Sequence, residues 1–296
     1  MNNDVKLPAG PKFGPGGNSE SFYAEGKKST VEAPAWVSAR GLDAYEFQGG
    51  NGIRGTDATF AKIGDEARRA GVFMSLHTPY YISLSGVEPE KRLKSVDYIM
   101  QSLHAAELIG ADTIVIHSGS ASKITRDEAM DLARDTLSHV MEAVGNTDIR
   151  LGLETMGKKN QLGTLDEVIE LCRTDPHFYP VVDFGHLNAR DCGGVFPDKD
   201  AYLRVFYRIG ETLGDKYART LHCHFSRIEF TSAGEKKHLT FADTVYGPDF
   251  YPLAEAIAAE RLSPRIICES AGTMAEDAAA MKAMFRTAEE KLNVNN

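Results

Sequence analysis

The sequence predicts a (β/α)8 TIM barrel, in which eight parallel strands alternate with helices. Short apolar runs alternate with amphipathic stretches along the whole chain, and eight such units fit a length of 296 residues. No change in composition marks a second domain. Six of the runs also end on a histidine or a carboxylate, at the end of the strand where barrel enzymes carry their active sites. We therefore expect residues 1–296 to form a single α/β barrel domain with a polar site at its C-terminal mouth.

Eight segments are predicted to be the barrel strands. Most of them are short, largely apolar runs between turn residues, a pattern typical of buried parallel strands, and the first is short and rich in glycine and proline. In chain order the predicted strands are Pro11–Gly14, Leu42–Gln48, Val72–His77, Ile114–His117, Leu151–Glu154, Val181–Asp183, Leu221–His224 and Ile266–Glu269.

Amphipathic stretches between these runs are predicted to be helices. Thr56 is an N-cap residue for the first of them, Gly71 ends it, and Thr125-x-x-Glu128 forms a capping box at the start of another. The predicted helices are Thr56–Ala70, Pro89–Ile109, Thr125–Val144, Thr164–Cys172, Lys199–Leu213, Phe250–Ala259 and Ala275–Leu292.

Bulk properties indicate a cytoplasmic protein of enzyme size. No apolar stretch approaches the roughly 18 to 20 residues of a membrane span. Residues Met1–Asp4 carry no basic region followed by an apolar core, so we expect no secretory signal. The four cysteines show no Cys-x-x-Cys spacing and are expected to be free thiols. A net charge of −9 argues against adhesion to nucleic acid through the whole surface, although a local basic face remains compatible with it.

The polar strand endings predict a metal site. C-terminal ends of parallel barrel strands converge at one mouth, and imidazole together with carboxylate is a ligand set typical of zinc or a similar divalent ion. His222 and His224 share one strand face, and His224 lies nearer the strand end, so we expect it to be the ligand. The six endings are His77, His117, Glu154, Asp183, His224 and Glu269. The remaining histidines of predicted helices and of a helix-to-strand loop, His104, His139 and His177, are expected to lie away from the site.

These same residues resemble the motifs of the endonuclease IV family of apurinic/apyrimidinic endonucleases. His77-Thr78-Pro79-Tyr80 looks like the family's His-x-Pro-Tyr segment, and His117-Ser118-Gly119-Ser120 looks like its His-Pro-Gly-Ser segment. The further matches are Leu153-Glu154-Thr155, Asp183-Phe184-Gly185-His186, His224-Phe225-Ser226 and Cys268-Glu269-Ser270. The similarity extends from about residue 40 to the end of the chain.

The resemblance implies a site with three zinc ions, and manganese or another divalent metal is the alternative. One metal would be held by His77, His117 and Glu154, and Glu154 would bridge to a second metal. That second metal would be held by Asp183, His224 and Glu269, and His186 and His238 would belong to a third. The implied reaction is hydrolysis of the DNA phosphodiester 5′ to an abasic site during base excision repair, with Glu154, Asp183 and Glu269 as the catalytic carboxylates.

The implied partner is DNA that contains an abasic site, bound by a monomer. Two tyrosines follow the His77 motif, at the family position that inserts into the DNA stack. Basic residues in predicted loops after the strands would supply phosphate contacts on the same face. The candidate DNA-binding residues are Tyr80, Tyr81, Lys158, Lys159, Arg227 and Lys237.

One motif departs from the family. The family has Asp-Arg-His where this chain has Lys236-Lys237-His238, and a protonated lysine has no lone pair for a metal. The third metal would then depend on His186 and His238, with Glu235 or Glu229 as substitutes. A lost third metal, or a changed activity, is the alternative.

Two other functions fit the sequence. Sugar isomerases and epimerases of the same barrel superfamily would use Glu154, Asp183, His224 and Glu269 to hold one divalent metal and would act on a small sugar. They are not expected to keep His77 as a further ligand together with His117 and His186, which favours the nuclease. A protein that binds abasic DNA without cleaving it is the third hypothesis, and the lysine at position 236 is its motivation.

Overall fold

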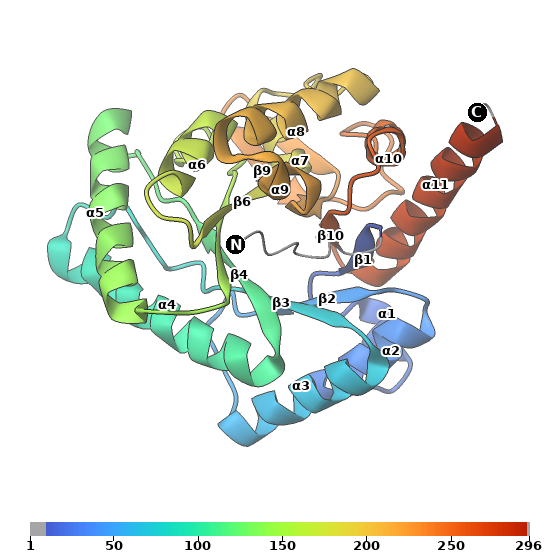
Figure 1. The fold of residues 1–296 in the computed structure, drawn as a ribbon, viewed down its shortest axis with the longest axis horizontal. Helices are drawn as coiled ribbons and strands as arrows, with labels where there is room; N and C mark the ends of the chain where they lie inside the picture. The colour runs from blue at the N-terminus through green and yellow to red at the C-terminus, as the bar shows by residue number, and fades with distance from the viewer. Residues whose placement is uncertain (1–9, 295–296) are drawn as a thin grey trace, which may run out of the picture.

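Eight parallel strands form the centre of the molecule, and helices surround them (Figure 1). This computed structural model describes residues 10–294, so Met1–Asp4, from which we expected no secretory signal, lies outside the described residues. Around the sheet the strands follow the order β1-β10-β7-β6-β5-β4-β3-β2. Their bounds are β1 Lys12–Pro15, β2 Ala44–Gln48, β3 Phe73–His77, β4 Ala111–His117, β5 Arg150–Glu154, β6 Phe178–Asp183, β7 His222–Phe225 and β10 Arg265–Cys268. The predicted TIM barrel is confirmed.

The barrel closes where β1 and β2 come together. The Asp43 amide donates to the Phe13 carbonyl at 2.8 Å, and the Gly17 amide donates to the Glu46 carbonyl at 3.0 Å. A Cβ at Gly14 would lie 1.7 Å from the Ala44 carbonyl oxygen, a distance that no side chain tolerates. The absence of a side chain at this position therefore permits the close approach of the first and second strands.

The seven predicted helices are all present, with ends that differ by at most two residues. Short helices before β2, after β6 and before β7 were not predicted, because segments of five to seven residues carry little periodic signal. The helices are α1 Glu20–Ala24, α2 Ala33–Ala39, α3 Asp57–Ala70, α4 Pro89–Ile109, α5 Arg126–Val144, α6 Leu165–Cys172, α7 Phe184–Arg190, α8 Lys199–Leu213, α9 Asp215–Arg219, α10 Tyr251–Ala259 and α11 Met274–Val294, with a 3-10 turn at Thr30–Glu32.

The predicted helix caps are observed. The Thr56 hydroxyl accepts a hydrogen bond from the Thr59 amide at the start of α3, and Gly71 ends that helix with a φ of +68°. Thr125 and Glu128 form the predicted capping box of α5, in which each side chain bonds the backbone of the other. These local signals explain why the long helices were predictable.

Two elements differ from the expectation near the mouth of the barrel. The segment after β6 that contains His186 and Arg190 was not among the predicted helices, but it forms α7, which Asp183 caps. The segment that follows β7, where Lys237 was expected in a loop, forms an antiparallel hairpin of β8 (Ile228–Thr231) and β9 (Gly234–His238). Lys236 and Lys237 therefore lie on a strand, and strand geometry decides which way they point.

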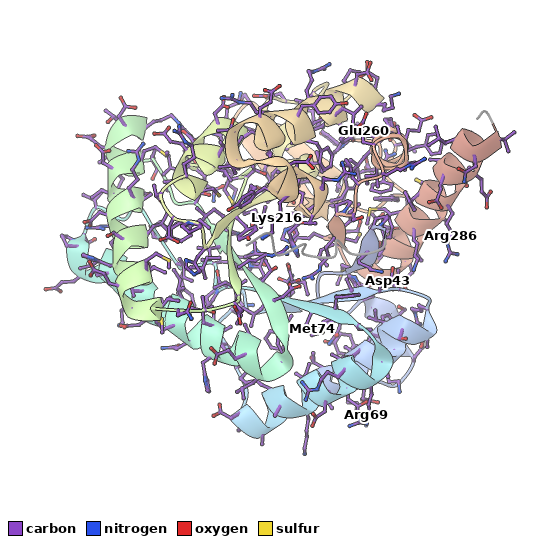
Figure 2. All side chains as sticks on the ribbon, in the orientation of Figure 1. Asp43, Arg69, Met74, Lys216, Glu260 and Arg286 are labelled. Carbon is purple, nitrogen blue, oxygen red and sulfur yellow. The ribbon has the colours of Figure 1, made fainter. Side chains whose placement is uncertain are left out.

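The opposite end of the barrel is closed by a charged pair. The Arg265 guanidinium, at the start of β10, donates to the Asp112 carboxylate of β4 at 2.6 and 2.7 Å, and to the Met74 carbonyl of β3 at 3.2 Å. Charged side chains such as Arg69 on α3 and Arg286 on α11 extend outward from the surrounding helices (Figure 2). In the described part of the chain, no helix is long and apolar enough to cross a membrane.

Candidate metal centre

Glu154, the last residue of β5, is the central carboxylate of the site. It is completely buried. Its Oε2 lies 3.4 Å from Nε2 of His77 and 3.3 Å from Nε2 of His117. On its other side, Oε1 lies 2.9 Å from Nδ1 of His224. One carboxylate thus faces two sets of histidines, which is the geometry that a ligand shared between two metal ions needs. The first group of ligand-type residues consists of His77, His117 and Glu154.

A second group of ligand-type atoms includes the other face of Glu154. Glu154, Asp183, His224 and Glu269 offer four ligand atoms that all lie within 4.8 Å of one another. Asp183 and His224 are direct partners across β6 and β7, so the strand register brings them together. Oδ1 of Asp183 accepts the His186 amide at 2.7 Å, whereas its Oδ2 accepts no hydrogen bond from the described chain.

A third group contains His186, Glu235 and His238. Nδ1 of His186 donates to the Thr155 carbonyl at 2.9 Å, while its Nε2 lies 3.5 Å from Glu235. Nδ1 of His238 lies 2.8 Å from the Ser226 hydroxyl, and its Nε2 lies 3.9 Å from Glu235. Both rings are therefore held through Nδ1 and present Nε2 to one carboxylate, an arrangement common among metal-binding histidines.

A β-bulge in the hairpin brings Glu235 and His238 to the same side. Glu229 pairs with Lys237, and the register then shifts by one residue, so that Lys236 has no partner on β8. The extra residue interrupts the alternation of side chains, which leaves Glu235 and His238 on the side of the site. Lys236 and Lys237 point to the other side, where their ammonium groups lie 2.5 and 3.3 Å from Glu229.

This geometry distinguishes the two carboxylates that the sequence offered in place of the family's aspartate. Glu229 is paired with lysines outside the centre, whereas Glu235 lies between two histidines. The residue at position 236 does not face the group at all. The lysine there consequently leaves the third group intact.

The donor set suits a divalent cation. Oε2 of Glu154 and Oδ2 of Asp183 are buried side-chain oxygens that accept no hydrogen bond from any residue in the described chain. Buried polar atoms are rarely left without a partner, and a bound ion can supply the partner that such an oxygen lacks. Imidazole nitrogens and carboxylate oxygens on rigid strand ends are ligands that zinc binds well.

Charge and burial shift the pKa values of these groups. Burial would raise the pKa of Glu154, but the facing imidazole rings hold it well below its usual range. Burial would lower the pKa of His77, but Glu154 raises it to about 9. The pKa of His186 likewise rises to about 9 against burial, beside Asp183 and Glu235. Glu154 is therefore ionised near neutral pH, the state that a metal-binding carboxylate requires.

The centre opens into a cavity of about 380 Å³ at the C-terminal mouth. Its walls include ligand-type residues of all three groups, together with Tyr80, Met156, Lys158 and Gln161. Tyr80 is 56% exposed, and its ring stacks on His117 at 5.5 Å between ring centres. A larger hollow of about 770 Å³ beside α6 and α8 contains none of the residues of the three groups.

The candidate DNA-binding residues separate into two sets. Tyr80 and Lys158 line the cavity. Tyr81 packs against Tyr98 at 4.6 Å, and the Lys159 ammonium lies 3.5 Å from the Cys192 sulfur. The two others have partners elsewhere: Arg227 donates to the Asp243 and Tyr246 carbonyls, and Lys237 pairs with Glu229.

The three histidines expected outside the site do lie outside it. His104 pairs with Asp57, His139 with Glu142 and His177 with Asp175. One buried residue near the centre was not singled out from the sequence, namely Glu46 of β2, which contacts His224. A glutamate within an otherwise apolar strand was the signal that could have identified it.

Comparison of the sequence with known proteins finds relatives of this chain. An uncharacterized protein of Methanocaldococcus jannaschii is 27% identical over 201 residues, which are 67% of this chain and 72% of that protein. A probable endonuclease 4 of Acholeplasma laidlawii is 27% identical over 165 residues, 54% of this chain and 55% of that relative. The match thus spans little more than half of the probable endonuclease 4.

Solved structures share the fold. Endonuclease IV from Thermus thermophilus gives a TM-score of 0.66 at 19% identity, covering 88% of this chain and 94% of that one. A 3-keto-D-glucoside 4-epimerase from E. coli gives a TM-score of 0.67 at 17% identity, covering 94% of this chain and 99% of that one. The relatives named probable endonuclease 4, together with this shared fold, confirm the resemblance to endonuclease IV. Since the family model described as xylose isomerase-like TIM barrel matches residues 34–287, the chain belongs to that family.

Proposed function

We propose that this protein is a zinc-dependent phosphodiesterase that hydrolyses the DNA backbone 5′ to an abasic site. The observation that carries the proposal is the sharing of Glu154 between two ligand groups, with a third group beside them. Such an arrangement suits two or three ions close together, and clusters of ions are characteristic of enzymes that cleave phosphate esters. The relatives named probable endonuclease 4 support the same reaction class.

Three sets of residues would hold the ions. His77, His117 and Glu154 form the first set, and Glu154 also belongs to the second with Asp183, His224 and Glu269. His186, Glu235 and His238 form the third. When bound, the zinc ions would supply Lewis acidity and neutralise the charge that develops on the phosphate oxygens.

Binding of a phosphodiester requires that cations neutralise the carboxylates of the cavity. Glu154, Glu235 and Glu269 line the cavity, and their carboxylates would repel a phosphodiester in the absence of cations. The histidines that face them set the orientation of each carboxylate before any substrate arrives.

Two cavity residues are suited to substrate recognition. The Lys158 side chain lines the cavity and would offer its ammonium group to a phosphate beside the cleaved bond. The exposed face of Tyr80, held by its stacking on His117, offers an aromatic surface for the gap that a missing base leaves in the duplex. Recognition of the lesion would thus come from the loop after β3.

A sugar epimerase is the alternative, and the epimerases among the solved structures share the fold. It would need one divalent ion, held by Glu154, Asp183, His224 and Glu269. The first and third groups would then have no role. Their position around one cavity favours the phosphodiesterase.

Incision of a defined duplex tests the proposal. We expect the zinc-loaded protein to nick a duplex with one tetrahydrofuran abasic analogue, leaving a 3′-hydroxyl, and to leave the intact duplex uncut. Chelation should abolish nicking, and added zinc should restore it. A fully metallated protein that leaves the abasic duplex uncut, and that epimerises ketoses with a single manganese ion, would overturn the proposal in favour of the alternative.

A further inference from the structure

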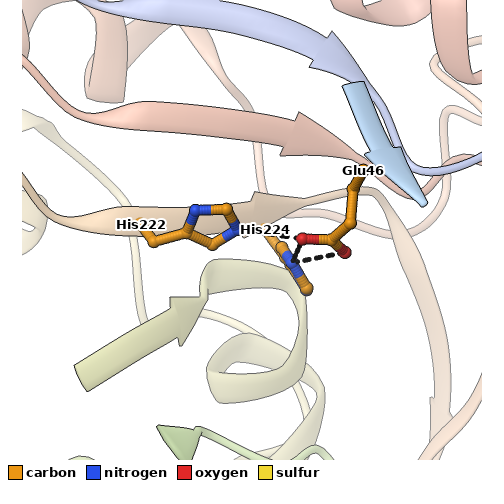
Figure 3. Close-up of side chains that lie close together, drawn as sticks. All are labelled: Glu46, His222 and His224. Atoms are coloured by element: carbon orange, nitrogen blue, oxygen red, sulfur yellow. Dashed lines mark hydrogen bonds and ion pairs between the residues drawn. The ribbon is translucent and has the colours of Figure 1, made fainter. Parts of the chain in front are cut away.

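A buried carboxylate on β2, which β1 and β10 separate from β7 around the barrel, contacts one of the ligand histidines. Glu46, on β2, is completely buried. Its Oε1 lies 3.1 Å from Nε2 of His224, and its Oε2 lies 3.0 Å from Nε2 of His222 (Figure 3). His224 is thus held between two glutamates, with Nε2 toward Glu46 and Nδ1 toward Glu154.

Glu46 also lies with His222 and His224 in a further set of ligand-type atoms, but it differs from Glu154 and Asp183 in having both carboxylate oxygens partnered. The Ser75 hydroxyl donates to Oε2 at 2.9 Å, and the side-chain amide of Gln48 donates to Oε1 at 3.4 Å. Within the described chain, Glu154 and Asp183 each have one buried oxygen that accepts no hydrogen bond. Glu46 has no such unpartnered oxygen. Glu46 consequently fits the role of a hydrogen-bond acceptor better than that of a metal ligand.

We propose that Glu46 is a positioning residue that, in the metal-loaded protein, keeps the proton of His224 on Nε2 and leaves the Nδ1 lone pair free for the ion held with Glu154, Asp183 and Glu269. The inference rests on the proposed metal function of that group and adds a residue outside it. A carboxylate that accepts the second ring N–H of a ligand histidine fixes the ring orientation and the tautomer. It also makes the other ring nitrogen more basic and therefore a stronger metal ligand.

The contacts around Glu46 make this role specific. The Glu46 carboxylate is held on one side by Ser75 and His222, so it presents a fixed acceptor to His224. His222 lies one layer deeper on β7, level with Val181 of β6, whereas His224 lies level with Asp183. His222 therefore holds the Glu46 carboxylate and is not a ligand. His224 contacts both Glu46 and the ligand-type residues of the centre.

The variant Glu46→Gln tests the proposal because it keeps the shape of the side chain and removes its charge. A glutamine amide can donate to Nε2, which would move the His224 proton to Nδ1 and block the lone pair. We expect the affinity for one of the bound zinc ions, measured by competition with a chromophoric chelator, to fall 10- to 100-fold. The Nε2–H proton resonance of His224 in the zinc-loaded protein, shifted downfield by the carboxylate, should move upfield or disappear.

Asp112→Asn is the matched control. It makes the same carboxylate-to-amide change at the other end of the barrel, and zinc affinity should stay at the wild-type value. If Glu46→Gln fails to fold, Ser75→Ala removes one donor to the carboxylate, and a several-fold weaker zinc affinity is expected. Unchanged affinity and an unmoved His224 resonance in the folded variant would overturn the role of Glu46 alone. A wild-type chain that binds no zinc would overturn both this role and the proposed function.

Discussion

At Glu154, one buried side chain has to serve histidines on both of its faces. Oε2 faces His77 and His117, and Oε1 faces His224. No other carboxylate in the described chain belongs to two of the candidate groups that form the centre. A change at this residue should therefore affect more of the centre than a change at any other carboxylate.

Replacing Glu154 by glutamine should abolish incision of abasic DNA and lower the zinc content by at least one ion per chain. The amide keeps the volume of the side chain but binds metal weakly, so the far-ultraviolet circular dichroism spectrum should not change. Elemental analysis and the nicking assay measure both effects. His139→Gln, on the outer helix α5, is the control and should keep wild-type content and activity. Measurable nicking by Glu154→Gln would contradict the shared role.

Replacing Glu235 by glutamine should remove the third ion alone. Glu235 lies between the Nε2 atoms of His186 and His238, whereas the neighbouring Lys236 faces away. We expect the zinc content to fall by one ion per chain in Glu235→Gln and to remain unchanged in Lys236→Gln. Equal zinc content in the two variants would contradict the assignment of Glu235, and not residue 236, as the member of the third group.

At the scale of elements, close packing of α3 on α4 depends on a glycine. A Cβ at Gly64 would lie 2.4 Å from the Leu108 carbonyl oxygen, which is backbone and has little freedom to move. Gly210 of α8 is also helical, but its added Cβ would meet nothing closer than 3.5 Å. Substituting alanine at Gly64 therefore tests packing between helices, whereas the same substitution at Gly210 tests helix propensity alone.

Gly64→Ala should destabilise the protein by about 1–3 kcal/mol through overpacking between α3 and α4. Gly210→Ala should instead stabilise it by about 0.4–1 kcal/mol, because alanine lowers the entropy of the unfolded chain at a position it can occupy without strain. Urea denaturation followed by circular dichroism measures both values. A Gly64→Ala protein as stable as the wild type would show that the two helices separate at low cost.

The elements also differ in how far the sequence predicted them. The helices with a capping threonine and a terminal glycine, such as α3 (Asp57–Ala70), have signals within a few residues of each end. The hairpin β8–β9 has none, since Glu235, Lys236 and Lys237 are three charged residues in a row without alternation. Its strand pairing comes from β8 and from packing against α7.

At the scale of the whole molecule, Arg265 ties strands from different parts of the chain. It joins β10 to β4 through Asp112 and to β3 through the Met74 carbonyl. Burial would raise the pKa of Asp112, but the adjacent Arg265 guanidinium holds it well below its usual range. The ionised pair therefore stabilises the closed barrel.

Asp112→Asn should lower the free energy of unfolding by about 1 kcal/mol at pH 7, a modest value because the Asp112 side chain is 48% exposed and water screens the pair. The folded pKa lies below the unfolded one, so the stabilisation is complete above a pH of about 4 and is lost as the pH falls further. Denaturation curves at pH 7 and pH 3 should show the difference between wild type and variant shrinking. A difference that grows toward pH 3 would contradict the assignment.

The residues of the candidate centre were predictable to the extent that they end strands. His77, His117 and Glu154 each close an apolar run, and every strand of a barrel ends at the same mouth. Glu46 has the same burial but sits inside a predicted strand, where its partner cannot be read from neighbouring residues. A contact between β2 and β7 depends on the curvature of the closed sheet.

The sequence by itself determined the barrel, its long helices and the mouth at which the ligand-type residues meet. These follow from local periodicity, capping residues and the polarity of the strand endings, all of which act over a few neighbouring residues. Only the tertiary structure decided that Glu235 and not Glu229 faces His186 and His238, and that Glu46 supports His224. A one-residue bulge and a contact across the barrel interior decide these points, and neither leaves a pattern in the order of residues.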